Sequence, residues 1–163
     1  MQVNNRNQNS MKQFGAFWLM LIVMLLLNMV YISIKLYKSN ISKPMLAKSE
    51  ITQAEFARLH TLSNYTLSIE SSFLIVLIIT MIIMFSKKHK SLIYRSLVLL
   101  LSFLILLLAV NIVAAQTFDA PSGNNVQLLF VPILLVAGVL IYVVLRKILP
   151  QRKDLRDTKK YNW

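Results

Sequence analysis

The chain has 163 residues, of which 56% are hydrophobic, and a formal net charge of +12. It contains no cysteine, which excludes disulfides, thiolate metal sites and cysteine nucleophiles. Four apolar runs of about 20 residues each occupy more than half of the sequence, and no soluble domain of ordinary size fits beside them. Attraction to anionic lipid beside these runs explains the positive charge, so we expect no nucleic-acid partner.

The N-terminal tail, residues 1–13, is rich in asparagine and glutamine and has no apolar pattern, which predicts disorder. The first apolar run follows at 14–34 and is interrupted by Asn28. This run is longer than the core of a signal peptide, roughly 7–15 residues, and no small-residue cleavage site follows it. It therefore predicts a retained transmembrane helix.

The connection after the first run, residues 35–64, contains a turn region around Pro44 and then a short helix that begins near Ser49. Thr52 and Glu55 have the spacing of a capping box, which marks the start of a helix. This helix would either lie on the membrane surface or extend the second span outwards. The extension is the favoured alternative.

The second and third apolar runs, 65–86 and 96–115, are joined by a short basic turn and are therefore expected to be antiparallel neighbours. Glu70 is the only formal charge within the four runs, and it lies near an end of the second. Asn111 interrupts the third run near its end. These polar groups are informative because polarity in hydrocarbon is costly unless it is paired.

The fourth run, 126–145, carries Pro132, which frees one carbonyl of the helix and predicts a kink. Pro150 is expected to end this helix and to begin the non-helical part of the basic tail, residues 146–163. The segment Asn124–Pro132 resembles one in the holin-like regulators of murein hydrolase export, which are also small four-pass proteins. The early spans lack the proline and glycine of that family, so no family is assigned.

The distribution of basic residues predicts the topology. Thirteen of the 18 Lys and Arg residues lie in the two tails and in the turn around residue 90, and five lie in the connection 35–64. Because positive residues near span ends stay on the cytoplasmic side, we expect an all-α, integral membrane four-helix bundle with both termini cytoplasmic, in the cell membrane. Aromatic residues near the run ends predict an interfacial belt: Trp18, Tyr31, Tyr37, Tyr65, Tyr94 and Tyr142.

This orientation gathers Asn28, Glu70 and Asn111 towards the outer side of the membrane, where they would form a polar pocket. A second interpretation assigns them structural roles. The two asparagines would then hydrogen-bond neighbouring helices together, and Glu70 would reach the headgroups beside Lys35 or Lys38. The second interpretation is favoured.

The sequence contains no set of residues typical of an enzyme or a coupled transporter. His60 and His89 are not paired at ligand spacing, no glycine-rich phosphate loop occurs, and no acidic residue lies near mid-membrane. We therefore expect no catalytic activity, no cofactor and no metal site.

These absences favour a non-enzymatic accessory or immunity-type protein that contacts another membrane protein or a toxin. The alternative is a small oligomeric transporter, channel or holin-like pore, which would require a homo-oligomer and a path lined by the three polar residues of the pocket. The richness in asparagine and lysine suggests an AT-rich bacterial genome.

Overall fold

The computed structural model describes the backbone of residues 2–46, 48, 51–86, 90–118, 120 and 122–160, and the side chains of residues 15–45, 48, 51–86, 92–118, 120 and 127–146. Within this part of the chain the backbone forms four helices. They are α1 (Gln2–Leu46), α2 (Gln53–Phe85), α3 (Lys90–Thr117) and α4 (Ser122–Lys160).

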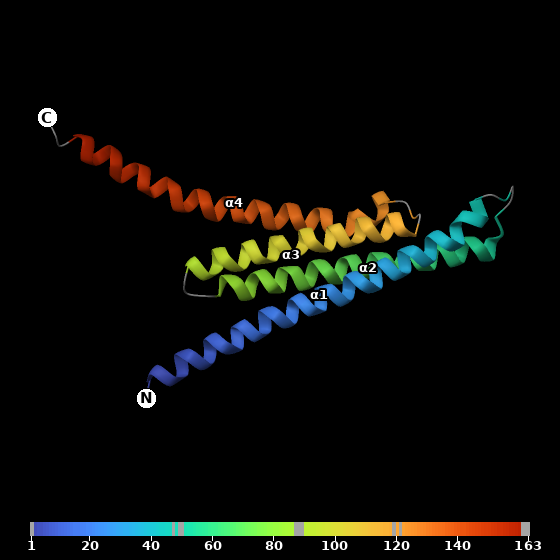
Figure 1. Cartoon of the computed structure of the whole chain (residues 1–163), viewed down its shortest axis with the longest axis horizontal. Helices are drawn as coiled ribbons and strands as arrows, with labels where there is room; N and C mark the ends of the chain where they lie inside the picture. The colour runs from blue at the N-terminus through green and yellow to red at the C-terminus, as the bar shows by residue number, and fades with distance from the viewer. Residues whose placement is uncertain are drawn as a thin grey trace.

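The four helices are arranged as two antiparallel hairpins (Figure 1). Helix α1 packs along α2 and α3 packs along α4, whereas contacts between the two pairs are much sparser. The start of α1, the end of α2, the start of α3 and the end of α4 lie at one end of the bundle. At the other end, α1 and α2 continue past the α3–α4 turn.

All four helices are long and apolar enough to cross a membrane, which agrees with the four predicted spans. The apolar segments are Gly15–Met45, Gln53–Phe85, Leu92–Thr117 and Gln127–Arg146. The all-α fold is thereby confirmed, and the length and composition of the helices indicate a membrane protein.

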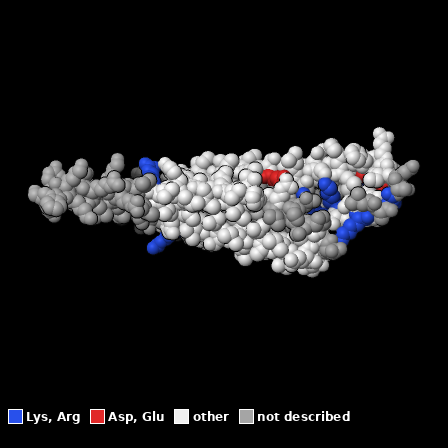
Figure 2. Space-filling model, turned by 90° about the horizontal axis from the view of Figure 1, so that it is seen from above, with Lys and Arg blue, Asp and Glu red and all other residues white. Residues whose placement is uncertain are grey.

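The core consists almost entirely of aliphatic and aromatic side chains. Helix α3 contributes four buried leucines at helical spacing, and α2 contributes Phe73 and Leu77, which are fully buried. Many other large apolar side chains point outwards, as expected for helices surrounded by lipid rather than water. Figure 2 shows the result, with uncharged atoms along the middle of the bundle and Lys and Arg towards its ends. The four leucines are Leu97, Leu100, Leu104 and Leu107.

The connection 35–64 is more regular than the sequence predicts. Helix α1 continues through Pro44 to Leu46, where we expected a turn region. Pro44 is exposed, so the carbonyl that its missing N–H leaves without a donor can bond water instead.

The predicted start of the second helix is confirmed. The backbone N–H of Glu55 donates to Thr52 Oγ1 at 3.3 Å, and the Thr52 N–H donates to Glu55 Oε2 at 3.0 Å, which completes the capping box. Helix α2 then runs without interruption to Phe85, so this segment extends the second span, as favoured above. We call residues 35–46 of α1 together with 53–64 of α2 the protruding hairpin.

Both terminal helices also extend further than predicted. Helix α1 begins at Gln2, within the tail 1–13 for which the sequence predicts disorder, and α4 passes Pro150 and ends at Lys160. Residues 2–13 contain neither glycine nor proline, so nothing in them stops a helix from growing outwards from the span. The side chains of both tails lie outside the described residues.

Candidate functional site

Two asparagines from different hairpins meet inside the bundle. Asn28 on α1 is 1% exposed and Asn111 on α3 is 0% exposed. Asn28 Nδ2 donates to Asn111 Oδ1 at 3.0 Å, and Asn111 Nδ2 donates to Asn28 Oδ1 at 3.1 Å. Each side-chain amide therefore gives and receives one hydrogen bond in a closed ring.

This amide pair connects helices that otherwise have few contacts. Helix α1 belongs to one hairpin and α3 to the other, and backbone contacts across the hairpins are sparse. Hydrogen bonds between membrane helices contribute about 0.6 kcal/mol on average and up to about 1.7 kcal/mol. The Asn28–Asn111 pair is thus a specific polar contact between the two hairpins.

A second polar contact lies one turn further along α1. Tyr31 is fully buried, and its hydroxyl donates to Glu70 Oε1 on α2 at 3.1 Å. The backbone of Leu128 in α4 also lies within hydrogen-bonding reach of this hydroxyl. Because Asn28 and Tyr31 are three residues apart, they share one face of α1. From that face they reach α3, α2 and α4.

The environment of Glu70 differs from that of the amide pair. Glu70 is half-buried, and it attracts the ammonium group of Lys35 electrostatically. Lys35 Nζ lies 5.2 Å from the centroid of the Tyr31 ring, a distance at which a cation is attracted to the ring face. Glu70 and Lys35 are therefore both tied to Tyr31, which stands between the amide pair and the protruding hairpin.

The structure divides the three residues of the predicted pocket into two contacts. Asn28 and Asn111 bond each other, and their amides face one another rather than an open space. Glu70 is held separately by Tyr31. The contact between the asparagines is the one that the structural interpretation expects, whereas its placement of Glu70 at the headgroups stays a prediction.

Sequence reasoning missed the position of Tyr31. It was grouped with the predicted aromatic belt, and the other five members are indeed exposed, between 44% and 63%. Tyr31 is 0% exposed and belongs to the core. The available signal was its spacing, three residues after Asn28 and four before Lys35, which places it on the polar face of α1.

Pro132 lies in α4, four residues after Leu128. It is buried in α4, which remains a continuous helix across this position, so the predicted kink stays a prediction. A proline provides no N–H to the carbonyl four residues earlier, here that of Leu128.

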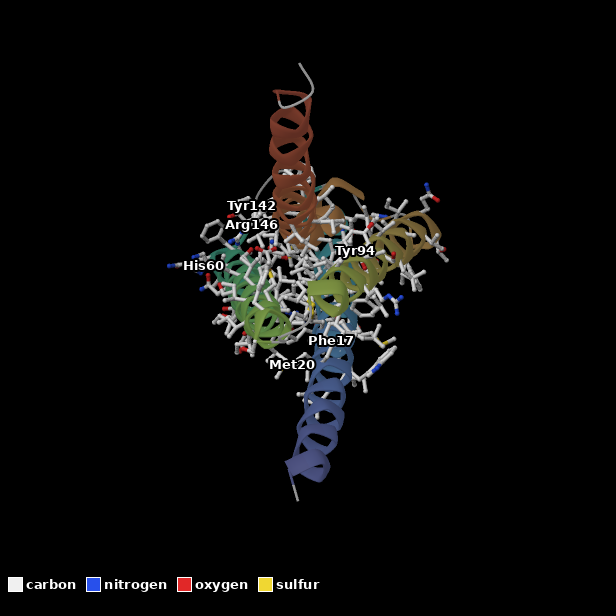
Figure 3. All side chains as sticks on the ribbon, turned by 90° about the vertical axis from the view of Figure 1, so that its left-hand side faces the viewer. Phe17, Met20, His60, Tyr94, Tyr142 and Arg146 are labelled. Atoms are coloured by element: carbon white, nitrogen blue, oxygen red, sulfur yellow. The ribbon has the colours of Figure 1, made fainter. Side chains whose placement is uncertain are left out.

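Among the described residues, no three His, Cys, Asp or Glu side chains lie together in a way that could hold a metal ion. His60 is exposed and points away from the bundle (Figure 3). His89 lies outside the described residues. No protein-family model, curated protein or solved structure matches this chain.

Proposed function

We propose that this chain is a non-enzymatic accessory or immunity-type membrane protein whose protruding hairpin contacts another membrane protein or a toxin. The observation that supports this proposal is the length of α1 and α2, which continue together past the α3–α4 turn (Figure 1). At 1.5 Å per residue, the part of α1 after Ile34 adds about 18 Å. Such a projection extends past the lipid headgroups into water.

Polar contacts tie the two helices of the protruding hairpin together. Lys38 Nζ donates to Ser63 Oγ at 2.6 Å, and the Arg58 guanidinium donates to the Tyr37 hydroxyl. Near the tip, Lys48 Nζ and Glu55 Oε1 form a 2.7 Å ion pair. Two contacts therefore join α1 to α2, and the third joins the connecting loop to α2. A hairpin held in this way presents a fixed surface to a partner, which reduces the entropy lost on binding.

Two large apolar side chains at and beside the tip of the protruding hairpin are exposed on the surface of the molecule. Phe56 is 65% exposed and Ile51 is 46% exposed, and both lie between the first apolar run, 14–34, and the second, 65–86. Exposed aromatic side chains beyond the membrane are typical anchors of protein–protein contacts. The partner we propose is therefore a protein, and Phe56 is its main contact.

The orientation follows from the basic residues. With both termini cytoplasmic, the protruding hairpin faces the exterior of the cell, where it would meet an incoming toxin or the outer part of a membrane complex. The cell membrane of a bacterium is the proposed location, on the basis of composition.

A pore or transporter remains the alternative, and it has less support. Its path would be lined by Asn28, Glu70 and Asn111, yet the two amides bond each other in the core and Glu70 bonds Tyr31. A conducting path along these side chains would require both contacts to open.

Site-specific photocrosslinking in living cells tests the proposed contact. We expect a photoreactive residue at Phe56 to give one discrete adduct with a different protein, identified by mass spectrometry and reproduced from the partner's side. The matched control is Ile141, which is 59% exposed within an apolar span and should crosslink to lipid. Adducts of Phe56 with lipid alone would contradict the proposal, and adducts with a second copy of this chain would favour the oligomeric alternative.

A further inference from the structure

Three cationic groups gather at the base of the protruding hairpin. Lys35 and Lys38 lie one turn apart on α1, directly after the apolar run ends at Ile34. Arg58 reaches the same turn from α2, with its guanidinium carbon 5.7 Å from the centroid of the Tyr37 ring. We call Lys35, Lys38 and Arg58 the cationic turn, and Figure 2 shows the surrounding concentration of Lys and Arg.

The hydrogen-bond and ring partners of the cationic turn are neutral, and Lys35 is also attracted electrostatically by Glu70. Lys38 bonds the hydroxyl of Ser63, Arg58 bonds and stacks on Tyr37, and Lys35 lies over the ring of Tyr31. The two described acidic groups nearby are already engaged. Glu70 accepts from the Tyr31 hydroxyl and Glu55 pairs with Lys48. Among the described side chains, the positive charge of the cationic turn therefore exceeds the negative charge beside it.

The position of the cationic turn along the membrane normal indicates which ligand it can reach. It follows directly after about 20 apolar residues, the length that fills the hydrocarbon core, so these cations lie at the level of the headgroup phosphates. The half-exposed Tyr37 ring lies in the same layer, where aromatic rings favour the interface. Guanidinium and ammonium groups form strong, short hydrogen bonds with phosphate oxygens.

We propose that the cationic turn binds the phosphate of an anionic phospholipid and thereby holds the base of the protruding hairpin in the headgroup layer. Lys38 and Arg58 donate to the phosphate oxygens from either side of Tyr37, and Lys35 adds positive charge from the bundle side. The site does not depend on the protein partner proposed above, nor on which side of the membrane the hairpin faces.

A tryptophan placed in the cationic turn reports on the lipid beside it. The test protein carries Tyr37→Trp together with Trp18→Phe and Trp163→Phe, so that its fluorescence comes from one position. It is reconstituted in vesicles of phosphatidylcholine with increasing phosphatidylglycerol, either of them brominated near the headgroup. We expect stronger quenching by brominated phosphatidylglycerol than by brominated phosphatidylcholine at equal mole fraction.

Two matched double variants test whether the preference arises from the cationic turn. Lys38→Gln/Arg58→Gln should reduce the relative affinity for phosphatidylglycerol by about thirtyfold at most, because each cation near an anionic surface contributes about fivefold. Lys43→Gln/Lys48→Gln removes the same charge nearer the tip and should leave the preference within twofold. Equal losses in both variants, or no preference in the test protein, would overturn the proposal. Reversal by millimolar inorganic phosphate would assign the site to a soluble anion and overturn it as well.

Discussion

Replacing either asparagine of the buried pair should destabilise the protein far more than replacing both. Asn28→Leu or Asn111→Leu removes one amide and leaves its cross-helix partner without the bond that it makes in the core. A buried polar group that loses its partner costs about 1–3 kcal/mol, so we expect each single variant to lose about 2 kcal/mol of unfolding free energy. Denaturation in mixed micelles measures the loss.

The double variant completes the thermodynamic cycle. Asn28→Leu/Asn111→Leu replaces a polar contact by an apolar one of similar volume, so its loss should not exceed that of the worse single variant. The coupling energy would then be about 1–2 kcal/mol. Leu106→Ala, an exposed position on the same helix as Asn111, is the control and should change stability little. Additive losses would show that the two amides do not act together.

Glu70→Gln should leave both the fold and the biological effect nearly intact. The carboxamide oxygen still accepts the bond from Tyr31, and only the attraction to Lys35 is lost, which contributes about 0–1 kcal/mol at a partly exposed site. Tyr31→Phe should cost more, about 1.5–3 kcal/mol, because it removes a buried hydrogen bond to a charged group. Denaturation in mixed micelles and membrane insertion levels measure both.

The Glu70→Gln variant also distinguishes the accessory function from the pore. If Glu70 lines a path, Glu70→Gln should abolish function while the protein still inserts at normal levels. Selective ion or solute flux through the purified protein in liposomes, lost in Glu70→Gln, would defeat the accessory function. Glu70→Leu is the matched control, since it removes the acceptor and should resemble Tyr31→Phe in stability.

The spans could be predicted because the bilayer imposes a simple requirement. Every backbone group inside hydrocarbon must be paired, so a run of about 20 apolar residues has to be a helix. The capping box could be predicted as well, because the side chains of Thr52 and Glu55 each accept a hydrogen bond from the other's backbone N–H within one turn. In both cases the information is local in the sequence.

The protruding hairpin was harder to predict because its helices depend on each other. Residues 35–46 include Pro44 and several hydroxyl residues, which by local rules favour a turn. The contacts Lys38–Ser63 and Tyr37–Arg58 join residues more than 20 positions apart, and they support α1 beyond its apolar run. Such pairing between elements overrides a weak local preference.

The sequence predicted which polar residues are informative, but it did not predict which of them bond each other. Polarity alone selected Asn28, Glu70 and Asn111, because each is unusual within an apolar run. Which of them meet depends on the relative rotation and height of three helices. In the structure, Asn28 bonds Asn111, and Glu70 accepts a hydrogen bond from Tyr31. The aromatic character of Tyr31 had suggested a position at the membrane–water interface.

We expect the protruding hairpin to stand outside the membrane, on the side opposite the termini. Because the sequence contains no cysteine, each introduced thiol is the only one in the protein, and thiol labelling can test this orientation directly. In intact cells, a membrane-impermeant maleimide should label Phe56→Cys and Ala120→Cys. Ser86→Cys should react only after the cells are permeabilised, and Val76→Cys should stay protected within its span. Labelling of Ser86→Cys in intact cells, or protection of Phe56→Cys there, would contradict this orientation.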